Sequence, residues 1–260
     1  MNCLIGILHC GESQYDACRA AIASQSHKNW DVFVVKDLPN VQAHQVLFKT
    51  FADNADQFDL FVKVDADMEL YHEDFLKELT HFFATESDID YLAMKVDDFF
   101  TARFIWGLNA FRSSVVFAEI DEVYTDKAAQ VEQNRRARLK RHKTLVPAAR
   151  HGFDPTDYHA FYFGCHKAVK VMHRQSRSHM RNIRRLPWAA LQRWDRRPLL
   201  AYAGAAIAFE RQMLPAELDH DSGKVRVLFD DLTRSKGNVG LLQSWRYRSA
   251  VVKAGFEYLG

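Results

Sequence analysis

Two aspartates, Asp65 and Asp67, are the residues of this chain whose spacing most clearly suggests chemistry. They follow residues 58–64, an apolar run with the composition of a buried strand. Residues i and i+2 of an extended segment point to the same side, so both carboxylates should face one small volume. Mg²⁺ binds one or two carboxylates and completes its shell with substrate phosphates. The pair therefore predicts a divalent-metal site, with a solvated turn as the alternative.

The sequence before and after this pair alternates between strand and helix patterns. Strands are predicted at 3–9, 31–37, 58–64 and 90–96, and helices at 15–24, 41–55 and 72–83. This alternation favours a parallel sheet, in which ligands bind at the carboxyl ends of the strands. We therefore expect Glu12, Asp37 and the Asp65/Asp67 pair on one rim. Lys63 is expected to face away from Asp65 and to be structural.

Beyond residue 100 the pattern changes. A turn into a helix is predicted at 106–112, a basic helix at 128–141 and an edge strand containing Pro147 at 144–151. Helices follow at 158–174 and 199–209, with prolines interrupting the segment between them. The expected fold is an α/β domain over residues 1–155, with a mostly parallel sheet flanked by helices. Residues 156–260 are expected to form a helical, basic C-terminal extension packed on it.

The charge of the chain is unevenly distributed. Residues 1–100 carry 18 Asp/Glu and 7 Lys/Arg, a net charge of −11, whereas residues 101–260 carry 15 and 28, a net charge of +13. Residues 167–197 alone hold ten Lys/Arg and one acid. This segment suggests contact with an anionic acceptor or an anionic membrane, where Trp188 and Trp194 suit interfacial depth. A solvated helical face is the simpler alternative, and no nucleic-acid-binding motif is present.

Signals for secretion or membrane insertion are weak. Residues 1–10 form a short apolar run without a basic flank or a cleavage site, and the apolar stretch 198–209 is about half the length of a membrane span. The four cysteines contain no C-x-x-C pair and are expected to be free thiols. The protein is expected in the cytoplasm, or peripherally at the inner face of the membrane.

Residues 2–151 resemble the GT-A fold of family-2 glycosyltransferases. The resemblance rests on the opening apolar strand, on Asp37 after the second strand, and on Asp65-Ala66-Asp67 after the next long strand. It implies transfer of a sugar from a nucleotide-diphosphate sugar, expected to be a UDP-sugar, to an acceptor hydroxyl, with inversion at the anomeric carbon. The implied cofactor is Mn²⁺ or Mg²⁺. The implied acceptor is a saccharide, or a lipid-linked or phosphorylated molecule, in bacterial surface polysaccharide synthesis.

The same resemblance implies roles for individual residues. Asp65, Asp67 and the late His151 would bind the metal, with Asp65 also in contact with the donor. Asp37 would accept a hydrogen bond from the donor's base, with a helix cap as the alternative. Two further donor contacts are predicted from position alone: Glu12 after the first strand, and Arg112 at the diphosphate, with a solvated side chain as the alternative for Arg112. Asp126 falls at the position of the family's general base, although Thr125 replaces the Glu expected before it. Asp121 is the second candidate for the base, followed by Asp97 and Asp98.

Other functions fit parts of the pattern. A nucleotidyltransferase would use a similar metal pair, but its Gly-rich basic loop is missing after the first strand. A phosphatase with a nucleophilic Asp would carry its D-x-D on the first strand instead of the third. A non-catalytic protein that binds anionic surfaces would explain the basic segment without using the aspartates. Metal-dependent nucleotide binding distinguishes the enzymes from this last alternative.

Overall fold

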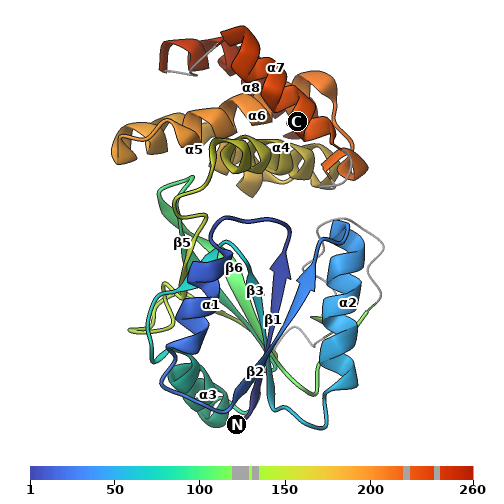
Figure 1. Cartoon of the computed structure of the whole chain (residues 1–260), viewed down its shortest axis with the longest axis vertical. Helices are drawn as coiled ribbons and strands as arrows, with labels where there is room; N and C mark the ends of the chain where they lie inside the picture. The colour runs from blue at the N-terminus through green and yellow to red at the C-terminus, as the bar shows by residue number, and fades with distance from the viewer. Residues whose placement is uncertain (119–128, 131–134, 219–222, 237–240, 260) are drawn as a thin grey trace. The chain divides into compact units, whose positions relative to one another are not determined.

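The computed structural model of the chain describes residues 1–118, 129–130, 135–218, 223–236 and 241–259. The chain divides into two compact units. The first unit comprises Met1–Phe99 and Arg103–Phe153, and the second comprises Phe100–Ala102 and Asp154–Gly260. The first unit is a mixed α/β structure built on a sheet, and the second is helical (Figure 1).

The first unit follows the strand–helix alternation of its sequence. Its elements in chain order are β1 (Cys3–His9), α1 (Tyr15–Ala23), β2 (Trp30–Lys36), α2 (Asn40–Asp53), β3 (Leu60–Asp65), β4 (Met68–Leu70), α3 (Phe75–Thr85), β5 (Tyr91–Asp98), β6 (Arg103–Arg112), β7 (Val116–Phe117), β8 (Ala129–Gln130), β9 (Arg136–Leu139) and β10 (Ala149–His151). The predicted strands and helices of the first hundred residues are confirmed, with shifts of a few residues at their ends. The three-residue strand β4 was not predicted.

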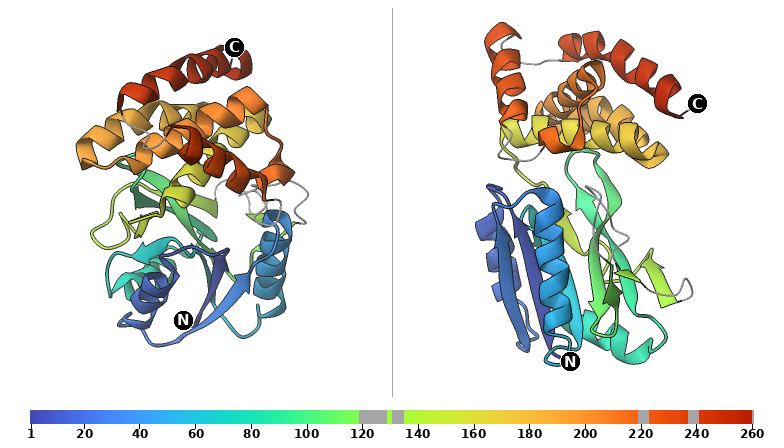
Figure 2. Two further views of the ribbon diagram at one scale, coloured as in Figure 1. Left: turned by 45° about the horizontal axis from the view of Figure 1, so that its top comes forward. Right: turned by 90° about the vertical axis from the view of Figure 1, so that its right-hand side faces the viewer.

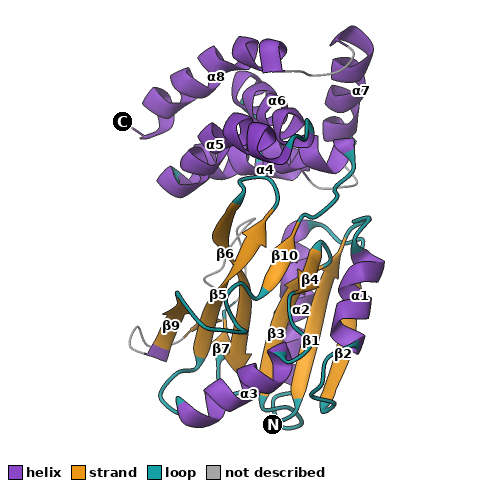
Figure 3. Ribbon diagram, turned by 90° about the vertical axis from the view of Figure 1, so that its left-hand side faces the viewer, coloured by secondary structure: helices purple, strands orange, loops and turns teal. Residues whose placement is uncertain are grey.

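The main sheet is mixed. Its strand order is β2-β1-β3-β6-β5-β10-β4, and β9 pairs with an earlier segment of β5 than β10 does (Figure 3). β1 is parallel to β2 and β3, β6 is antiparallel to both β3 and β5, and β10 is parallel to β5. Consequently β1, β2, β3, β5 and β10 all run in one direction, and their carboxyl ends meet at one rim of the sheet.

Both faces of the sheet are covered. Ile5 and Ile7 of β1 belong to a buried cluster with side chains of α1 and α3, whereas Leu4 belongs to a second cluster with side chains of α2. This division follows from the alternation of side chains along a strand. Aromatic rings dominate the α2 side, where Phe51 stacks on Phe61 with centroids 4.7 Å apart. Helices α1 and α2 therefore lie on opposite faces (Figure 1; α2 in front of the sheet in Figure 2, right).

The second unit is built from helices. They are α4 (Asp157–Arg174), α5 (Arg177–Arg193), α6 (Arg197–Arg211), the 3-10 helix η2 (Pro215–Leu218), α7 (Lys224–Lys236) and α8 (Leu241–Leu259). Thr156 and Ser176 cap α4 and α5 by accepting hydrogen bonds from the backbone N–H groups of His159 and His179. Within the described residues, no helix is both long enough and apolar enough to cross a membrane.

Helices α4 and α6 approach each other closely through two glycines. A Cβ atom on Gly164 would lie 1.7 Å from the carbonyl oxygen of Ala201, and a Cβ atom on Gly204 would lie 2.2 Å from that of Phe161. Contact at this distance requires glycine at both positions. The predicted helices at 158–174 and 199–209 are confirmed as α4 and α6.

Four predictions made beyond residue 100 are wrong. Residues 106–112 belong to strand β6 instead of a helix, and residues 136–139 form β9 within the last part of the basic helix predicted at 128–141. β10 lies inside the sheet, between β5 and β4, and covers only residues 149–151, so Pro147 precedes the strand. Pro187 lies within α5 and does not interrupt it. In β6 and β9, pairing with β5 overrides the local preference for helix.

Candidate active site

The acidic residues singled out in the sequence lie on the rim where the parallel strands end. Asp65 is the last residue of β3 and is level with Leu8 near the end of β1. On the other side of β6, Asp98 ends β5 and is level with His151, which ends β10. Carboxylates and an imidazole thus collect at one rim, which is where open α/β sheets bind ligands.

The strand order creates a switch point at β1. β2 lies on one side of β1 and β3 on the other, and the helices that make these two connections cover opposite faces. The loops that leave β1 and β2 therefore lead to opposite faces of the sheet, which leaves a crevice between them. Residues 10–13 follow β1, and Asp37 follows β2. Ligands of open α/β sheets bind in such a crevice.

Strand β4 brings His151 next to Asp67. β4 begins immediately after Asp67, and its first residue, Met68, is paired with His151 of β10. The backbone N–H of Gly152 also donates to the carbonyl oxygen of Asp67 at 2.9 Å. As a result, Nε2 of His151 lies 3.3 Å from Oδ2 of Asp67. Two of the three residues predicted to bind a metal, Asp67 and His151, are therefore neighbours.

The other ring nitrogen of His151 is held by Asp98. Nδ1 lies 2.7 Å from Oδ1 of Asp98, whose side chain is fully buried. A carboxylate at Nδ1 places the proton there, and leaves Nε2 as the ring atom directed at Asp67. This arrangement is typical of histidines that bind metals, in which an outer carboxylate fixes the ring. Asp98 was only a distant candidate for the general base in the sequence analysis.

Lys63 acts directly on Asp65. Its ammonium donates to Oδ1 of Asp65 at 2.6 Å. The prediction that Lys63 faces away was wrong, because residues 63 and 65 are two apart on one strand and share a face. Burial raises the pKa of Asp65, but the charge and the hydrogen bond of Lys63 outweigh it and hold that pKa below its ordinary value. Asp65 is therefore ionised with Lys63 as its counter-ion.

Asp67 is in the opposite electrostatic situation. Burial raises its pKa to about 6, against the lowering effect of His151, and the negative charges of Asp65, Glu12 and Asp98 raise it further. The Asp67 carboxylate is therefore surrounded by more negative than positive charge. A divalent cation would supply the balancing positive charge.

The geometry fits a metal at Asp67 in one further respect. Oδ1 of Asp67 is buried and has no hydrogen-bond partner among the residues that the structure describes. Buried carboxylate oxygens normally have a partner, and a cation would provide one. In the arrangement seen, no three His, Cys, Asp or Glu side chains of the described residues converge closely enough to hold a metal. Asp67 and His151 form the core of the candidate site, while Asp65 is bonded to Lys63.

Glu12 shapes the loop after β1. Its Oε2 accepts a hydrogen bond from the backbone N–H of Cys10 at 2.6 Å and lies 3.0 Å from Nδ1 of His9. The ring of His9 stacks on Tyr15 with centroids 4.2 Å apart, and Nζ of Lys36 lies 5.2 Å from the centroid of Tyr15. Glu12 therefore lies on the rim as expected, with its carboxylate engaged by its own loop.

Asp37 and Arg112 have different locations. Asp37 is exposed directly after β2 on the same rim, in a left-handed conformation with φ of 52°.

Arg112 is level with Leu60, which begins β3, so it lies at the opposite end of the sheet from Asp65. Its guanidinium donates to the carbonyl oxygens of Phe83, Glu86 and Ile89. This geometry gives Arg112 a structural role at the end of α3, and we leave it out of the candidate site.

The two leading candidates for the general base, Asp121 and Asp126, lie outside the residues that the structure describes. Among the other candidates, Asp98 is committed to His151. Asp97 pairs with Phe104 across β5 and β6, and the alternation along β5 puts it on the other face of the sheet from Asp98. Asp98 therefore serves better as a positioning residue than as a base.

Comparison with known proteins leaves the family open. No model of a protein family matches the chain, and no curated protein sequence is similar to it.

Proposed function

We propose that this protein is a metal-dependent glycosyltransferase with a GT-A fold that transfers a sugar from a nucleotide-diphosphate sugar, with a UDP-sugar as the expected donor. One observation carries the proposal: Asp67 and His151, far apart in the sequence, lie 3.3 Å apart at the carboxyl rim of the sheet. Open α/β sheets bind ligands at this rim, and a metal there would hold the diphosphate of a nucleotide.

The residues of the rim have separate tasks in this proposal. Asp67 and His151 would hold the Mn²⁺ or Mg²⁺ ion, and Asp65 would join them once its carboxylate gives up its hydrogen bond to Lys63. Asp98 keeps the His151 ring in the orientation that presents Nε2. A bound metal would supply Lewis-acid stabilisation of the leaving diphosphate. Lys63, released from Asp65, would provide a further positive charge at the same rim.

The donor and the acceptor would contact different residues. Asp37, at the end of β2, accepts hydrogen bonds from the nucleoside base, and the loop of Glu12 borders the diphosphate. An ionised carboxylate, with Asp126 as the first candidate and Asp121 as the second, takes the proton from the acceptor hydroxyl as it attacks the anomeric carbon. A single displacement of this kind inverts the anomeric configuration.

A thermal-shift screen of nucleotides and nucleotide sugars, with and without Mn²⁺, tests the proposal. UDP or another nucleoside diphosphate should stabilise the protein only with the metal, by about 2.7 kcal/mol at a hundred times its dissociation constant. Asp67→Asn should fold and lose this increment. Lys77→Gln, at an exposed lysine of α3, is the control and should keep it. Equal stabilisation of the wild type and Asp67→Asn would rule out the metal role.

A nucleotidyltransferase remains the nearest enzymatic alternative, since it would bind a nucleotide and a metal at the same rim. The products separate the two. Transfer of a sugar releases a nucleoside diphosphate, whereas transfer of a nucleotide releases pyrophosphate. Detection of pyrophosphate with a nucleoside triphosphate and a sugar phosphate as substrates would support the alternative.

We propose that helix α5 contacts an anionic membrane surface. Its last turns and the residue after them expose Trp188, Leu191 and Trp194, with Trp194 94% accessible. Arg177 and Arg181 are exposed towards its first turns. A helix with exposed apolar and aromatic side chains beside cations suits an anionic bilayer surface. This supports a lipid-linked acceptor in surface polysaccharide synthesis and a peripheral location at the inner face of the membrane.

Vesicle binding tests this part separately. Binding to phosphatidylglycerol-containing vesicles should weaken with salt, and should weaken further in Arg177→Gln with Arg181→Gln. The matched control is Arg19→Gln with Lys28→Gln, which removes two exposed charges from the first unit. Equal binding by all three proteins, or tighter binding to RNA than to vesicles, would contradict the membrane surface. The thermal-shift result for Asp67→Asn is independent of this outcome.

A further inference from the structure

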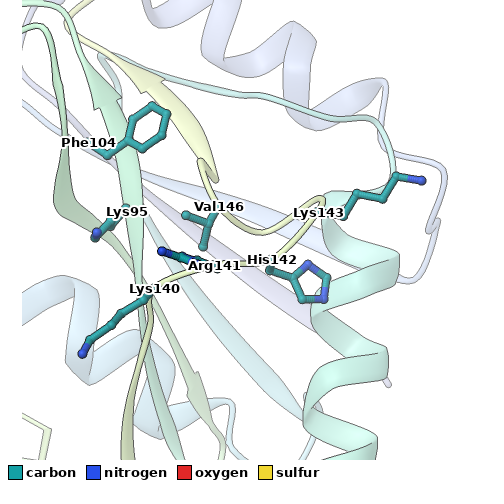
Figure 4. Close-up of a pocket in the computed structure, with 7 residues that line it drawn as sticks. All are labelled: Lys95, Phe104, Lys140, Arg141, His142, Lys143 and Val146. Carbon is teal, nitrogen blue, oxygen red and sulfur yellow. The ribbon is translucent and has the colours of Figure 1, made fainter.

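The first unit carries a basic pocket that the proposed reaction does not use. It has a volume of about 580 Å³ and is lined by Lys95 of β5, Phe104 of β6 and the loop residues Lys140, Arg141, His142 and Lys143 (Figure 4). Alternation along β5 puts Lys95 on the other face of the sheet from Asp98. The pocket is therefore separate from the candidate metal site.

The sheet itself creates this pocket. β9 pairs with Tyr91–Met94 of β5 and β10 pairs with Asp97–Asp98, so the chain leaves the edge of β5 after β9 and returns at β10. Lys95 lies in the gap, at a register shift between β5 and β6. Its carbonyl oxygen accepts a hydrogen bond from Ala148 at the end of the loop. β-Bulges of this kind redirect side chains out of the sheet.

His142 fixes the conformation of the loop before any ligand binds. Its Nδ1 accepts hydrogen bonds from the backbone N–H groups of Thr144 and Leu145, at 3.2 and 3.1 Å. His142 also forms a β-bridge with Val146, and Leu145 is fully buried. Because Nδ1 is an acceptor, the neutral ring carries its proton on Nε2, which is a donor. The loop therefore presents its donors from a fixed backbone, which lowers the cost of binding.

The polar groups of the lining are cationic or neutral donors, and no acid is among them. Nζ of Lys95 lies 5.3 Å from the ring centroid of Trp106, and the guanidinium of Arg138 on β9 lies 5.7 Å from it. Trp106 thus holds two cations of this surface through cation–π contacts. None of Lys95, Lys140, Arg141 and Lys143 forms an ion pair with an acid of the described residues. An anion that enters the pocket would therefore be attracted by these cations without competing with an acid of the described residues.

The lining defines the chemistry of the ligand. Ammonium and guanidinium groups at several positions require a ligand with several negative charges, and the guanidinium of Arg141 matches phosphate geometry. Phe104 is 53% exposed, and with Val146 it offers an apolar surface beside the charges. The volume lies within the range of sites for small molecules. A multiply phosphorylated small molecule satisfies all of these features.

We propose that this pocket binds a polyanion with two or more phosphate groups, such as a phosphorylated sugar or an oligophosphate. Lys95, Lys140, Arg141 and Lys143 neutralise the phosphates, and Phe104 packs against the carbon skeleton. The site is distinct from the metal-dependent donor site and needs no divalent ion. Binding of a polyanion in this pocket is therefore independent of whether the protein transfers sugars.

Isothermal titration with inorganic tripolyphosphate in EDTA tests the pocket, because EDTA removes the metal on which the donor site depends. The wild type should bind one equivalent, with an affinity that falls as salt rises. The double variant Arg141→Gln with Lys143→Gln should lose affinity for tripolyphosphate by about tenfold or more, because two charge-assisted hydrogen bonds are lost. Both side chains are exposed, so the fold should persist. Arg19→Gln with Lys28→Gln removes the same charge elsewhere and should bind as the wild type does.

Other results would overturn the proposal. Equal affinity of the wild type and Arg141→Gln with Lys143→Gln would mean that the phosphates bind elsewhere. An equal loss in both double variants would mean that only net charge matters. A single-stranded RNA that binds far more tightly than tripolyphosphate, and loses affinity in the loop variant, would identify the surface as one for nucleic acid. Asp67→Asn should bind tripolyphosphate normally, which separates this result from a failure of the proposed enzymatic function.

Discussion

Nδ1 of His151 lies 2.7 Å from a fully buried carboxylate oxygen of Asp98, and this contact fixes which ring nitrogen faces Asp67. The pair links the ends of β10 and β5, two adjacent parallel strands. Its role in the proposed site is to orient a ligand and not to contact the substrate. Substitution of Asp98 therefore tests the orientation of the His151 ring more specifically than substitution of His151 itself.

Asp98→Asn should weaken Mn²⁺ binding about 10–100-fold, which is the usual effect of losing an outer partner of a metal ligand. The carboxamide keeps the size of the side chain but no longer fixes the proton of His151 as a carboxylate does. Mn²⁺ titration monitored by electron paramagnetic resonance measures the free ion directly. Asp97→Asn, on the other face of the strand, is the control and should bind Mn²⁺ as the wild type does. Equal affinities of all three proteins would contradict the orienting role.

Metal binding should depend on pH through Asp67. Burial, together with the neighbouring carboxylates, raises the pKa of Asp67 to about 6 in the metal-free protein. The carboxylate must be ionised to bind a cation, so protons compete below that value. Mn²⁺ affinity should be constant well above pH 6 and should fall by about tenfold per pH unit well below it. Calorimetry from pH 5 to 8 checks this dependence, and a flat profile would exclude Asp67 as a ligand.

Arg112→Gln should affect stability and leave the site intact. The change removes hydrogen bonds from a charged donor to three carbonyl oxygens at the end of α3 and a cation–π contact with Phe83. The free energy of unfolding should fall by about 1–3 kcal/mol. Urea denaturation measures this loss. Stabilisation by Mn²⁺ and UDP should be unchanged, whereas its disappearance would restore Arg112 as a donor contact.

Asp126→Asn should abolish sugar transfer and leave metal-dependent nucleotide binding intact, because the base contacts the acceptor and not the donor. Loss of a general base typically lowers the rate about 10²–10⁴-fold. Release of UDP in the presence of an acceptor, together with thermal shift, separates the two effects. Asp121→Asn is the parallel variant. If only Asp121→Asn is inactive, the base has been assigned to the wrong Asp. If both variants remain active, neither residue is the base.

The sequence allowed the first hundred residues to be predicted well because each element has a clear period. Apolar runs such as residues 3–9 predict strands, and their alternation with helices predicts a common rim for Asp65 and Asp67. The prediction failed where pairing with distant residues decides the structure. β9 contains Ala and Arg, which favour helix locally, yet it pairs with β5.

The candidate site was predicted in part for a similar reason. Asp65, Asp67 and His151 could be proposed from their positions after strands. Asp98 could not be assigned its role, because that role depends on a contact between residues 53 positions apart. One signal was present: two acids, Asp97 and Asp98, directly follow the strand predicted at 90–96, at the same rim as Asp65. Lys63 could have been placed correctly, since its separation of two from Asp65 puts both on one side of the strand.

The pairing of β4 with β10 has a consequence for the order in which the protein assembles. β1, β2 and β3 can associate through local crossovers, but His151 reaches Asp67 only after β10 has paired with both β4 and β5. Contacts between residues so distant in sequence form slowly, because a long loop must close first. On a ribosome, the aspartate pair would therefore emerge and fold well before its histidine. Competence to hold the metal would be acquired only when the last strand of the unit has been synthesised.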